Sequence, residues 1–259
     1  MKNFALVTGA SKGIGRAIAF SLARRNYNLL LVARSENELK LLRELLIQKY
    51  GISVEYFVTD LSQREAAKGV ANWLSFNNFE VSVLVNNAGY GLWGDFSELD
   101  LTEQLNMVQL NVNTLVELSH YIIPYLKKHS KSYILNVSST AAYQAVPTLA
   151  LYAASKSFVL SFTRALRHEL REGPISVTCI CPGPVDTGFA ERAGLNALSK
   201  MAQAFNMKPE EVAEFAVRGM LKGRAEVIPG PTNFISAFAT RLLPKNLIEN
   251  AAAGIYKLQ

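Results

Sequence analysis

The sequence is short of the residue types that several common protein classes require. Its 259 residues include two cysteines and three histidines, and 19% of them are charged, against about 25% in an average soluble protein. Cys179 and Cys181 cannot supply a disulfide framework, and their spacing on an apolar run predicts buried, reduced thiols on one face of a strand. The histidines share no motif, so we expect no metal site.

Long apolar runs are also missing. No stretch of about 18 apolar residues occurs, so we expect no transmembrane segment. The first residues lack the pattern of a secretory leader, which favours a cytoplasmic protein. Internal repeats and low-complexity linkers are absent too, and the length suits a single α/β domain.

Basic residues exceed acidic residues by 27 to 21, which gives a formal net charge of +6. Such a surplus fits nucleic acid, an anionic membrane or an acidic small molecule. No basic run is longer than a pair of residues. We therefore expect no nucleic-acid partner and favour small anions.

Short apolar runs alternate with longer amphipathic runs along most of the chain. This alternation predicts an α/β fold, a doubly wound parallel sheet with helices on both faces. The expected strands are residues 3–8, 28–33, 53–59, 81–87, 132–139, 175–180 and 226–228. The expected helices are residues 13–25, 36–50, 64–77, 102–129 and 151–171, followed by one that Pro209 opens.

We expect one domain over 1–259 with three functional parts. Residues 1–187 would form the cofactor and catalytic core, 188–225 a substrate loop-helix region, and 226–259 the last strand and a helical tail. The tail combines apolar clusters with Arg241, Lys245 and Lys257. It could cover the substrate lobe, which we favour, join a subunit interface or touch a membrane surface.

A glycine-rich loop follows the first expected strand. Gly9, Gly13 and Gly15 stand between this strand and the next helix, in the spacing G-x3-G-x-G. Glycines there let the backbone turn sharply and approach a pyrophosphate, and a helix N-terminus favours the anion. The alternative is an ordinary βα turn.

The end of the second expected strand bears on which dinucleotide would bind. A carboxylate at this position would bind a ribose 2′-hydroxyl and favour NAD. The chain has Arg34 instead, and Lys12 lies in the glycine loop. Two cations suit a 2′-phosphate, so we favour NADP(H) over NAD(H). Arg34 could also be a solvated residue, with Glu36 as the acid.

Tyr152 and Lys156 form a pair one helical turn apart. A phenol ordinarily has a pKa of about 10, and a cation nearby favours its ionised form. The i, i+4 spacing brings both side chains to one site, where the phenol could act as a general acid. Ser139 ends the strand thirteen residues before Tyr152, and Asn111 lies within the long helix that precedes this strand.

The combined motifs resemble the short-chain dehydrogenase/reductase family. TGASKGIG, NNAG, LNVN, NVSS followed by YAASK, and PGPVDT occur in that family's order over residues 3 to about 187. The resemblance implies a Rossmann-like sheet of about seven strands and an oxidoreductase similar to carbonyl or 3-oxoacyl reductases. It also implies a catalytic tetrad of Asn111, Ser139, Tyr152 and Lys156.

The resemblance gives each tetrad residue a role. Tyr152 would exchange a proton with the carbonyl or alcohol oxygen, and Lys156 would hold the nicotinamide ribose. Ser139 would bind the substrate oxygen, and Asn111 would order a water by interrupting its helix. The implied cofactor-binding residues are Gly9, Ser11, Lys12, Gly13, Ile14, Gly15, Arg34, Asp60, Leu61, Asn87, Ala88, Gly89, Tyr152, Lys156, Pro182, Gly183, Val185 and Thr187.

Several of these assignments have competitors. Ser138 could face the site in place of Ser139, and Asn113 could replace Asn111. Asp60 and Thr187 could each serve only as a helix cap.

The substrate side carries aromatic residues and little fixed charge. Residues 90–96, 141–147 and 188–207 should line the mouth, with Tyr143 among them. An apolar pocket suits a lipophilic ketone or 3-oxoacyl thioester. The rival hypothesis is a catalytically silent NADP(H) sensor or scaffold. We expect a homodimer through the helices at 102–129 and 151–171, with a tetramer as the alternative.

Overall fold

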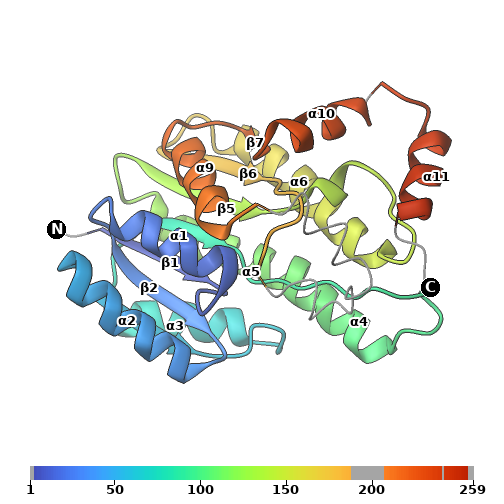
Figure 1. The fold of residues 1–259 in the computed structure, drawn as a ribbon. Helices are drawn as coiled ribbons and strands as arrows, with labels where there is room; N and C mark the ends of the chain where they lie inside the picture. Colours follow the sequence, from blue (N-terminus) through green and yellow to red (C-terminus); the bar gives the residue numbers. More distant parts are fainter. Residues whose placement is uncertain (1–2, 188–206, 241, 256–259) are drawn as a thin grey trace.

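Seven parallel strands form the centre of the computed structural model, which describes residues 3–187, 207–240 and 242–255. The strand order is β3-β2-β1-β4-β5-β6-β7. The strands are β1 (Phe4–Thr8), β2 (Asn28–Ala33), β3 (Val54–Val58), β4 (Val81–Asn86), β5 (Ser132–Val137), β6 (Ile175–Ile180) and β7 (Glu226–Val227). The predicted doubly wound sheet is confirmed, as is the single domain (Figure 1).

Helices cover both faces of the sheet. Those in the described ranges are α1 (Gly13–Ala23), α2 (Glu36–Tyr50), α3 (Ala66–Phe76), α4 (Leu101–Val108), α5 (Thr114–Leu126), α6 (Ala150–Glu169), α9 (Pro209–Leu221), α10 (Pro231–Ala239) and α11 (Lys245–Ile255), with a π-helical segment η1 (Gln109–Asn113) and a 3₁₀ turn η2 (Thr140–Tyr143). Among these elements no helix is long and apolar enough to span a membrane.

An apolar layer covers each face of the sheet, which explains why the strands are continuous apolar runs in the sequence. Side chains from α1, α2 and α9 pack on one face of the sheet, with Leu29 and Leu31 of β2. Side chains from α3, α5 and α6 pack on the other face, with Leu30 and Val32. Successive residues of a strand point to opposite faces, and every residue of β2 is buried.

The predicted long helix over 102–129 is interrupted in the structure. α4 ends at Val108, η1 occupies Gln109–Asn113, and α5 resumes at Thr114. A π-helical turn inserts one residue per turn and commonly occurs at functional sites. The sequence-based helix was therefore too long as one regular element, and its interruption at Asn111 is confirmed.

The strand order reverses between β1 and β4, because β1 is flanked by β2 on one side and by β4 on the other. In open parallel sheets a ligand binds at the carboxyl ends of the strands beside such a switch point. Both the glycine loop after β1 and the NNAG segment after β4 begin there. This edge is the expected place for a site.

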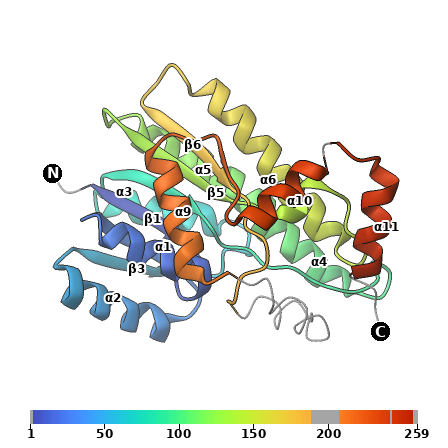
Figure 2. The same ribbon diagram turned by 45° about the horizontal axis from the view of Figure 1, so that its top comes forward.

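The tail lies on the side of the molecule opposite to α2 (Figures 1 and 2). It leaves the sheet after β7 and forms α10 and α11, so its predicted helical character is confirmed. α10 contacts η2, the short turn that follows β5.

Candidate active site at the carboxyl edge

The glycine loop makes a tight cradle between β1 and α1. Gly9 and Gly13 have φ values of +63° and +58°, a backbone region that side chains with a Cβ rarely adopt. A Cβ on Gly15 would lie 2.3 Å from the carbonyl oxygen of Gly9, so only glycine lets α1 pack so closely on the loop. Lys12 is the N-cap residue and makes no side-chain capping bond.

This geometry fits the phosphates of a dinucleotide. The first N–H groups of a helix have no partner within the helix, and its dipole favours an anion at this end. Ser11 and Ile14 lie in the same strand–loop–helix turn. The residues present thus fit the group that the sequence motif implies.

Thr8 joins the glycine loop to the segment after β4. Its hydroxyl accepts hydrogen bonds from the N–H of Asn87 (2.9 Å) and Ala88 (3.0 Å). The Asn87 amide donates to the carbonyl of Thr8 at 2.9 Å. The structure therefore brings Asn87, Ala88 and Gly9 together. Thr8 is not among the predicted site residues, although its position directly before Gly9 could have indicated it.

Arg34 and Asp60 meet beyond the ends of β2 and β3. The guanidinium of Arg34 lies 3.5 Å from the Asp60 carboxylate, and the Arg34 side chain is about half exposed. Burial alone would raise the pKa of Asp60, but hydrogen bonds from Ser62 and the charge of Arg34 outweigh it and lower the pKa. Asp60 caps the turn at Ser62 rather than α3, which begins at Ala66.

Leu61, the neighbour of Asp60, is buried. Its carbonyl accepts a 2.6 Å hydrogen bond from the Thr114 hydroxyl. This bond ties the loop after β3 to the start of α5.

Lys156 is a buried cation on the face of α6 that also carries Tyr152. Its Nζ donates to the carbonyl of Val137 at 3.1 Å and lies 5.7 Å from the centre of the Tyr152 ring. Burial lowers the pKa of Lys156 to about 8, and the nearby thiols Cys179 and Cys181 act in the opposite direction. The ammonium is therefore held close to the phenol in a protected site.

Asn111 is buried in the π-helical segment and is fixed by three hydrogen bonds. Its amide donates to the carbonyl of Tyr90 (2.9 Å) and to the Ser155 hydroxyl (3.1 Å), and its Oδ1 accepts from the Tyr90 N–H (3.2 Å). A Cβ on Gly89 would lie 2.8 Å from this Oδ1 and 3.4 Å from Nζ of Lys156. Asn111 and Lys156 thus flank Gly89.

Hydrogen bonds distinguish the predicted residues Asn111 and Ser139 from their competitors Asn113 and Ser138. Asn113 is exposed and bonds to Gln109 on its own helical segment. Ser138 is buried and donates to the carbonyl of Lys156 at 2.7 Å, so its hydroxyl is turned into α6. Ser139 is half-buried, and its oxygen accepts from the N–H of Ala141 at 3.1 Å. The geometry favours Asn111 and Ser139.

The segment after β6 folds back over the glycine loop. A Cβ on Gly13 would lie 3.0 Å from Cβ of Thr187, and Val185 pairs with Met207 in a β-bridge. Thr187 bonds to the carbonyl of Val185 at 3.4 Å. Its predicted alternative role as a helix cap concerns residues 188–206, which lie outside the described ranges.

Asn233 of α10 packs against this segment, and the sequence contained no signal for it. A Cβ on Gly183, which follows Pro182, would lie 2.3 Å from Oδ1 of Asn233. The Asn233 amide donates to the carbonyl of Pro229 at 2.8 Å. The first turn of the tail therefore abuts the Pro182–Thr187 segment.

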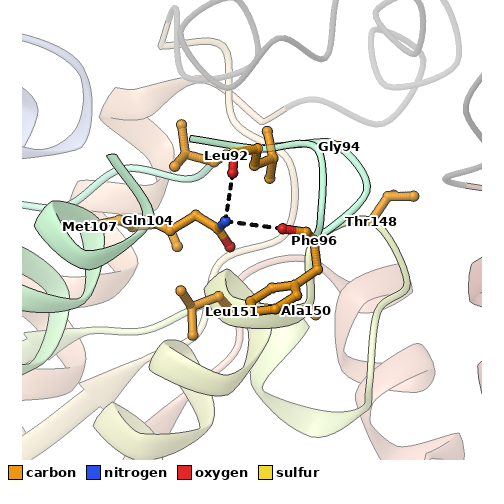
Figure 3. Close-up of a pocket in the computed structure, with 9 residues that line it drawn as sticks. Leu92, Gly94, Phe96, Gln104, Met107, Thr148, Ala150 and Leu151 are labelled. Carbon is orange, nitrogen blue, oxygen red and sulfur yellow. Dashed lines mark hydrogen bonds between the residues drawn. The ribbon is translucent and has the colours of Figure 1, made fainter. Parts of the chain in front are cut away.

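A small cavity lies near Tyr152, under the loop that carries residues 92–99. It has a volume of about 50 Å³ and is lined by Leu92, Gly94, Phe96, Leu99, Gln104, Met107, Thr148, Ala150 and Leu151. Gln104 donates to two backbone carbonyls of this loop, those of Phe96 at 3.1 Å and Leu99 at 3.0 Å. Figure 3 shows Gln104 pointing toward the loop, with its bond to Phe96. The lining is mostly apolar, as predicted for this region.

Tyr143 lies in one of the segments predicted to line the mouth, and its hydroxyl bonds to a distant strand. Its hydroxyl donates to the Glu226 carboxylate at 2.7 Å, and Arg164 donates to the same carboxylate at 2.7 Å. The bond from Tyr143 ties η2 to the edge strand β7. Of the three predicted lining segments, 188–206 lies outside the described ranges.

The fold and the residues gathered at its carboxyl edge are those of a dinucleotide-binding oxidoreductase. The short chain dehydrogenase family model matches residues 3–197. Since that match covers well over half of the sequence, the chain belongs to the short-chain dehydrogenase/reductase family.

Individual relatives agree with this assignment. The chain is similar to a very-long-chain 3-oxoacyl-CoA reductase of Anas platyrhynchos, with 33% identity over 193 residues. The match covers 73% of this chain and 61% of that protein, so the chain spans under two thirds of its length.

Two solved structures resemble the chain over more of its length. A short-chain dehydrogenase from Sphingobium yanoikuyae in complex with NADPH has a TM-score of 0.82 and 26% identity, covering 99% of this chain and 96% of that one. A short chain dehydrogenase/reductase from Burkholderia phymatum in complex with NAD has a TM-score of 0.81 and 25% identity, covering 91% and 92%. Relatives of similar likeness thus hold either dinucleotide.

Proposed function

We propose that the protein is an NADP(H)-dependent reductase of a lipophilic ketone or 3-oxoacyl thioester. The observation that carries this proposal is the buried Lys156 ammonium beside Tyr152, with Ser139 and Asn111 at the same edge of the sheet. A poised phenol has no use in a protein that only binds a dinucleotide.

The proposed reaction reduces a carbonyl to a secondary alcohol. The glycine loop would hold the dinucleotide, which would supply a hydride, and with it two electrons, to the carbonyl carbon. Tyr152 donates its hydroxyl proton to the carbonyl oxygen, and the reverse reaction returns that proton to the phenolate. Ser139 donates a hydrogen bond to the same oxygen and favours the negative charge that develops there. Lys156 stabilises the phenolate that remains.

The same residues would restore the proton. Asn111 lies beside Gly89 together with Lys156, and it would position a water that passes a proton to the lysine. Its own amide is held by Tyr90 and Ser155, so it can keep this position through the cycle. A group held by its neighbours needs little reorganisation during the reaction.

Two cations support the preference for NADP(H). Lys12 lies in the glycine loop and Arg34 beyond β2. In the structure Arg34 pairs with Asp60. A 2′-phosphate would compete with this carboxylate for the guanidinium, and charge-assisted bonds to phosphate are strong.

Apolar residues near the site support the proposed substrate class. Leu92, Met107 and Leu151 line the small cavity near Tyr152, and the Anas platyrhynchos relative is a 3-oxoacyl-CoA reductase.

We further propose that the protein functions in the cytoplasm. We propose that its parts are a core (1–187), a substrate region (188–225) and a tail (226–259), and that it forms a homodimer through α4, α5 and α6. Leu101, Leu105 and Phe158 expose apolar surface on α4 and α6, which supports that dimer.

A substrate panel tests the proposal. The purified protein is mixed with NADPH or NADH and a series of ketones and 3-oxoacyl thioesters, and dinucleotide oxidation is followed by absorbance. We expect turnover with NADPH and a lipophilic substrate. Tight NADPH binding without turnover of any substrate would replace the proposal by a dinucleotide sensor.

A further inference from the structure

α10 exposes its large apolar side chains, which is unusual for a helix at a protein surface. Its fully buried side chain is that of Ala237, whereas Phe234, Ile235 and Phe238 each expose more than half of their surface. A helix at the surface of a soluble protein normally turns its large apolar side chains toward the core. The outward face of α10 therefore lacks its apolar partner among the described residues.

The exposed apolar surface continues along the tail. Leu242, Leu243 and Leu247 are 51–70% exposed, like the three residues of α10. These six residues, which we call the tail patch, lie within residues 234–247. Single exposed apolar side chains are normal, but six of them within fourteen consecutive residues are typical of an interaction surface.

The charge around the tail patch is mostly positive. From Val227 to Ile248 the chain has Arg241 and Lys245 and no acidic residue, and the flanking acids are Glu226, which is paired with Arg164, and Glu249. Arg224, just before β7, is exposed and has no ion pair among the described residues. An apolar face with a cationic rim is the composition of a segment that binds at an anionic membrane interface.

A groove joins the cationic rim to the apolar face. It has a volume of about 420 Å³ and is lined by Arg164, Arg224, Ala225, Glu226, Ile228 and Phe234. Arg164 is paired with Glu226 at 2.7 Å, so Arg224 supplies the uncompensated charge of the groove. Phe234 belongs to both the groove and the tail patch. The headgroup phosphate of a phospholipid could thus bind Arg224, while the acyl chains of the same lipid lie along α10.

We propose that the tail patch docks on an anionic phospholipid membrane. A second copy of the chain fits the patch less well, because a twofold interface would bring the same surface onto itself. Arg224, Arg241 and Lys245 would then approach like charges, and Glu249 is the one acid within residues 227–250 that could offset them. Anionic headgroups neutralise these cations while the six apolar residues enter the interface.

Vesicle flotation tests the proposal without using the catalytic activity. The whole protein is mixed with vesicles of phosphatidylcholine or of phosphatidylcholine with phosphatidylserine, at low and high salt. We expect binding to the anionic vesicles that falls as salt is raised, because salt screens the cationic rim. Equal binding to both vesicles, or to neither, overturns the proposal.

Matched variants separate the apolar and the cationic contributions. Phe234→Ser with Phe238→Ser should weaken binding at least 10-fold, because two buried aromatic side chains are lost. The control is Phe76→Ser, since Phe76 is 87% exposed and lies on α3, away from the tail. Lys245→Glu should weaken binding roughly 10-fold. Its control, Lys40→Glu on the exposed side of α2, changes the net charge equally and should leave binding unchanged.

Two further measurements keep the result unambiguous. Thermal unfolding and NADPH binding show whether each variant is folded, and Ile235→Ser with Leu247→Ser replaces the aromatic pair if it is not. Sedimentation without vesicles then reports the oligomeric state. If the patch variants lower the molecular mass while vesicle binding of the wild type is absent, the patch is a subunit interface and the membrane proposal is wrong.

Discussion

α9 and α10 have similar first turns, but the apolar side chains of α9 are buried and those of α10 are exposed. Each has proline in its first turn and contains several apolar residues. α9 buries Val212, Val217 and Met220 against the sheet, whereas α10 turns Phe234 and Phe238 to the surface. The apolar content of a helix therefore predicts that it has an apolar face. Whether that face is buried depends on whether the fold provides a layer to cover it.

The same contrast separates the layered domain from the tail. In the layered domain, the sheet and its two helical layers fix each side chain from several sides. In the tail, exposed side chains have few neighbours. Changes in the first region should therefore have large effects on activity and stability, and changes in the second should have small ones.

Tyr152→Phe should have the largest effect, a fall in kcat of about 1,000-fold, which corresponds to about 4 kcal/mol. The variant lacks the proton that the carbonyl oxygen must receive, while its ring still fills the same space. Steady-state kinetics with NADPH and the best substrate of the panel measure this. Tyr143→Phe is the control, because that hydroxyl bonds to Glu226, and it should keep activity within about 10-fold. Near-full activity of Tyr152→Phe would contradict the mechanism.

Met220→Ala should lower the free energy of unfolding by about 3 kcal/mol. Met220 is fully buried in the layer between α9 and the sheet, and its truncation leaves a cavity. Urea unfolding measures the change. A loss below about 1 kcal/mol would show that α9 is packed more loosely than the structure indicates.

Lys156 should make stability depend on pH above neutrality. Burial lowers its pKa to about 8, whereas an unfolded lysine titrates near 10.4. Between these values the unfolded chain binds more protons than the folded one, so the contribution of Lys156 to stability rises with pH. Below pH 8 the full penalty of a buried cation remains.

The comparison with Lys156→Met isolates this contribution from other titrating groups. The difference in unfolding free energy, wild type minus variant, should increase by about 1.5 kcal/mol from pH 8 to about pH 9.5. Urea unfolding at both pH values measures it. An equal difference at both would mean that the lysine is not desolvated as the structure indicates.

Arg34→Ala should raise KM for NADPH about 10-fold, or about 1.4 kcal/mol, and change KM for NADH about 2-fold or less. The lost guanidinium would have bound only the 2′-phosphate, which NADH lacks. Arg43→Ala is the control, since Arg43 also pairs with an acid, Glu55 at 3.7 Å. Equal effects on both cofactors would refute the role of Arg34.

Phe238→Ala should have the smallest effect, a change in unfolding free energy within about 0.5 kcal/mol. About half of the Phe238 surface is exposed, so its truncation leaves no closed cavity. The measurement is the same urea unfolding as for Met220→Ala. A loss comparable to that of Met220→Ala would remove the contrast between the tail and the layered domain.

Most of the fold could be predicted because its signals are local. The runs at 28–33 and 36–50 match β2 and α2 at both ends. The glycine loop and the Tyr152–Lys156 pair could also be located, since each depends on residues within a few positions of one another. Asn111, Ser139, Tyr152 and Lys156 then lie on the side of the sheet where its parallel strands end.

The sequence alone thus determined the order of strands and helices, the sheet they form and the residues expected at its carboxyl edge. The tertiary structure decided that Tyr143 bonds to Glu226, 83 residues away, that Asn233 meets Gly183 and that α10 faces outward. The periodicity of apolar residues and the residue types at turns depend on neighbours in the chain, so both can be recognised in the sequence. Contacts between distant segments depend on which layer each element has to pack against, and only the folded chain supplies that layer.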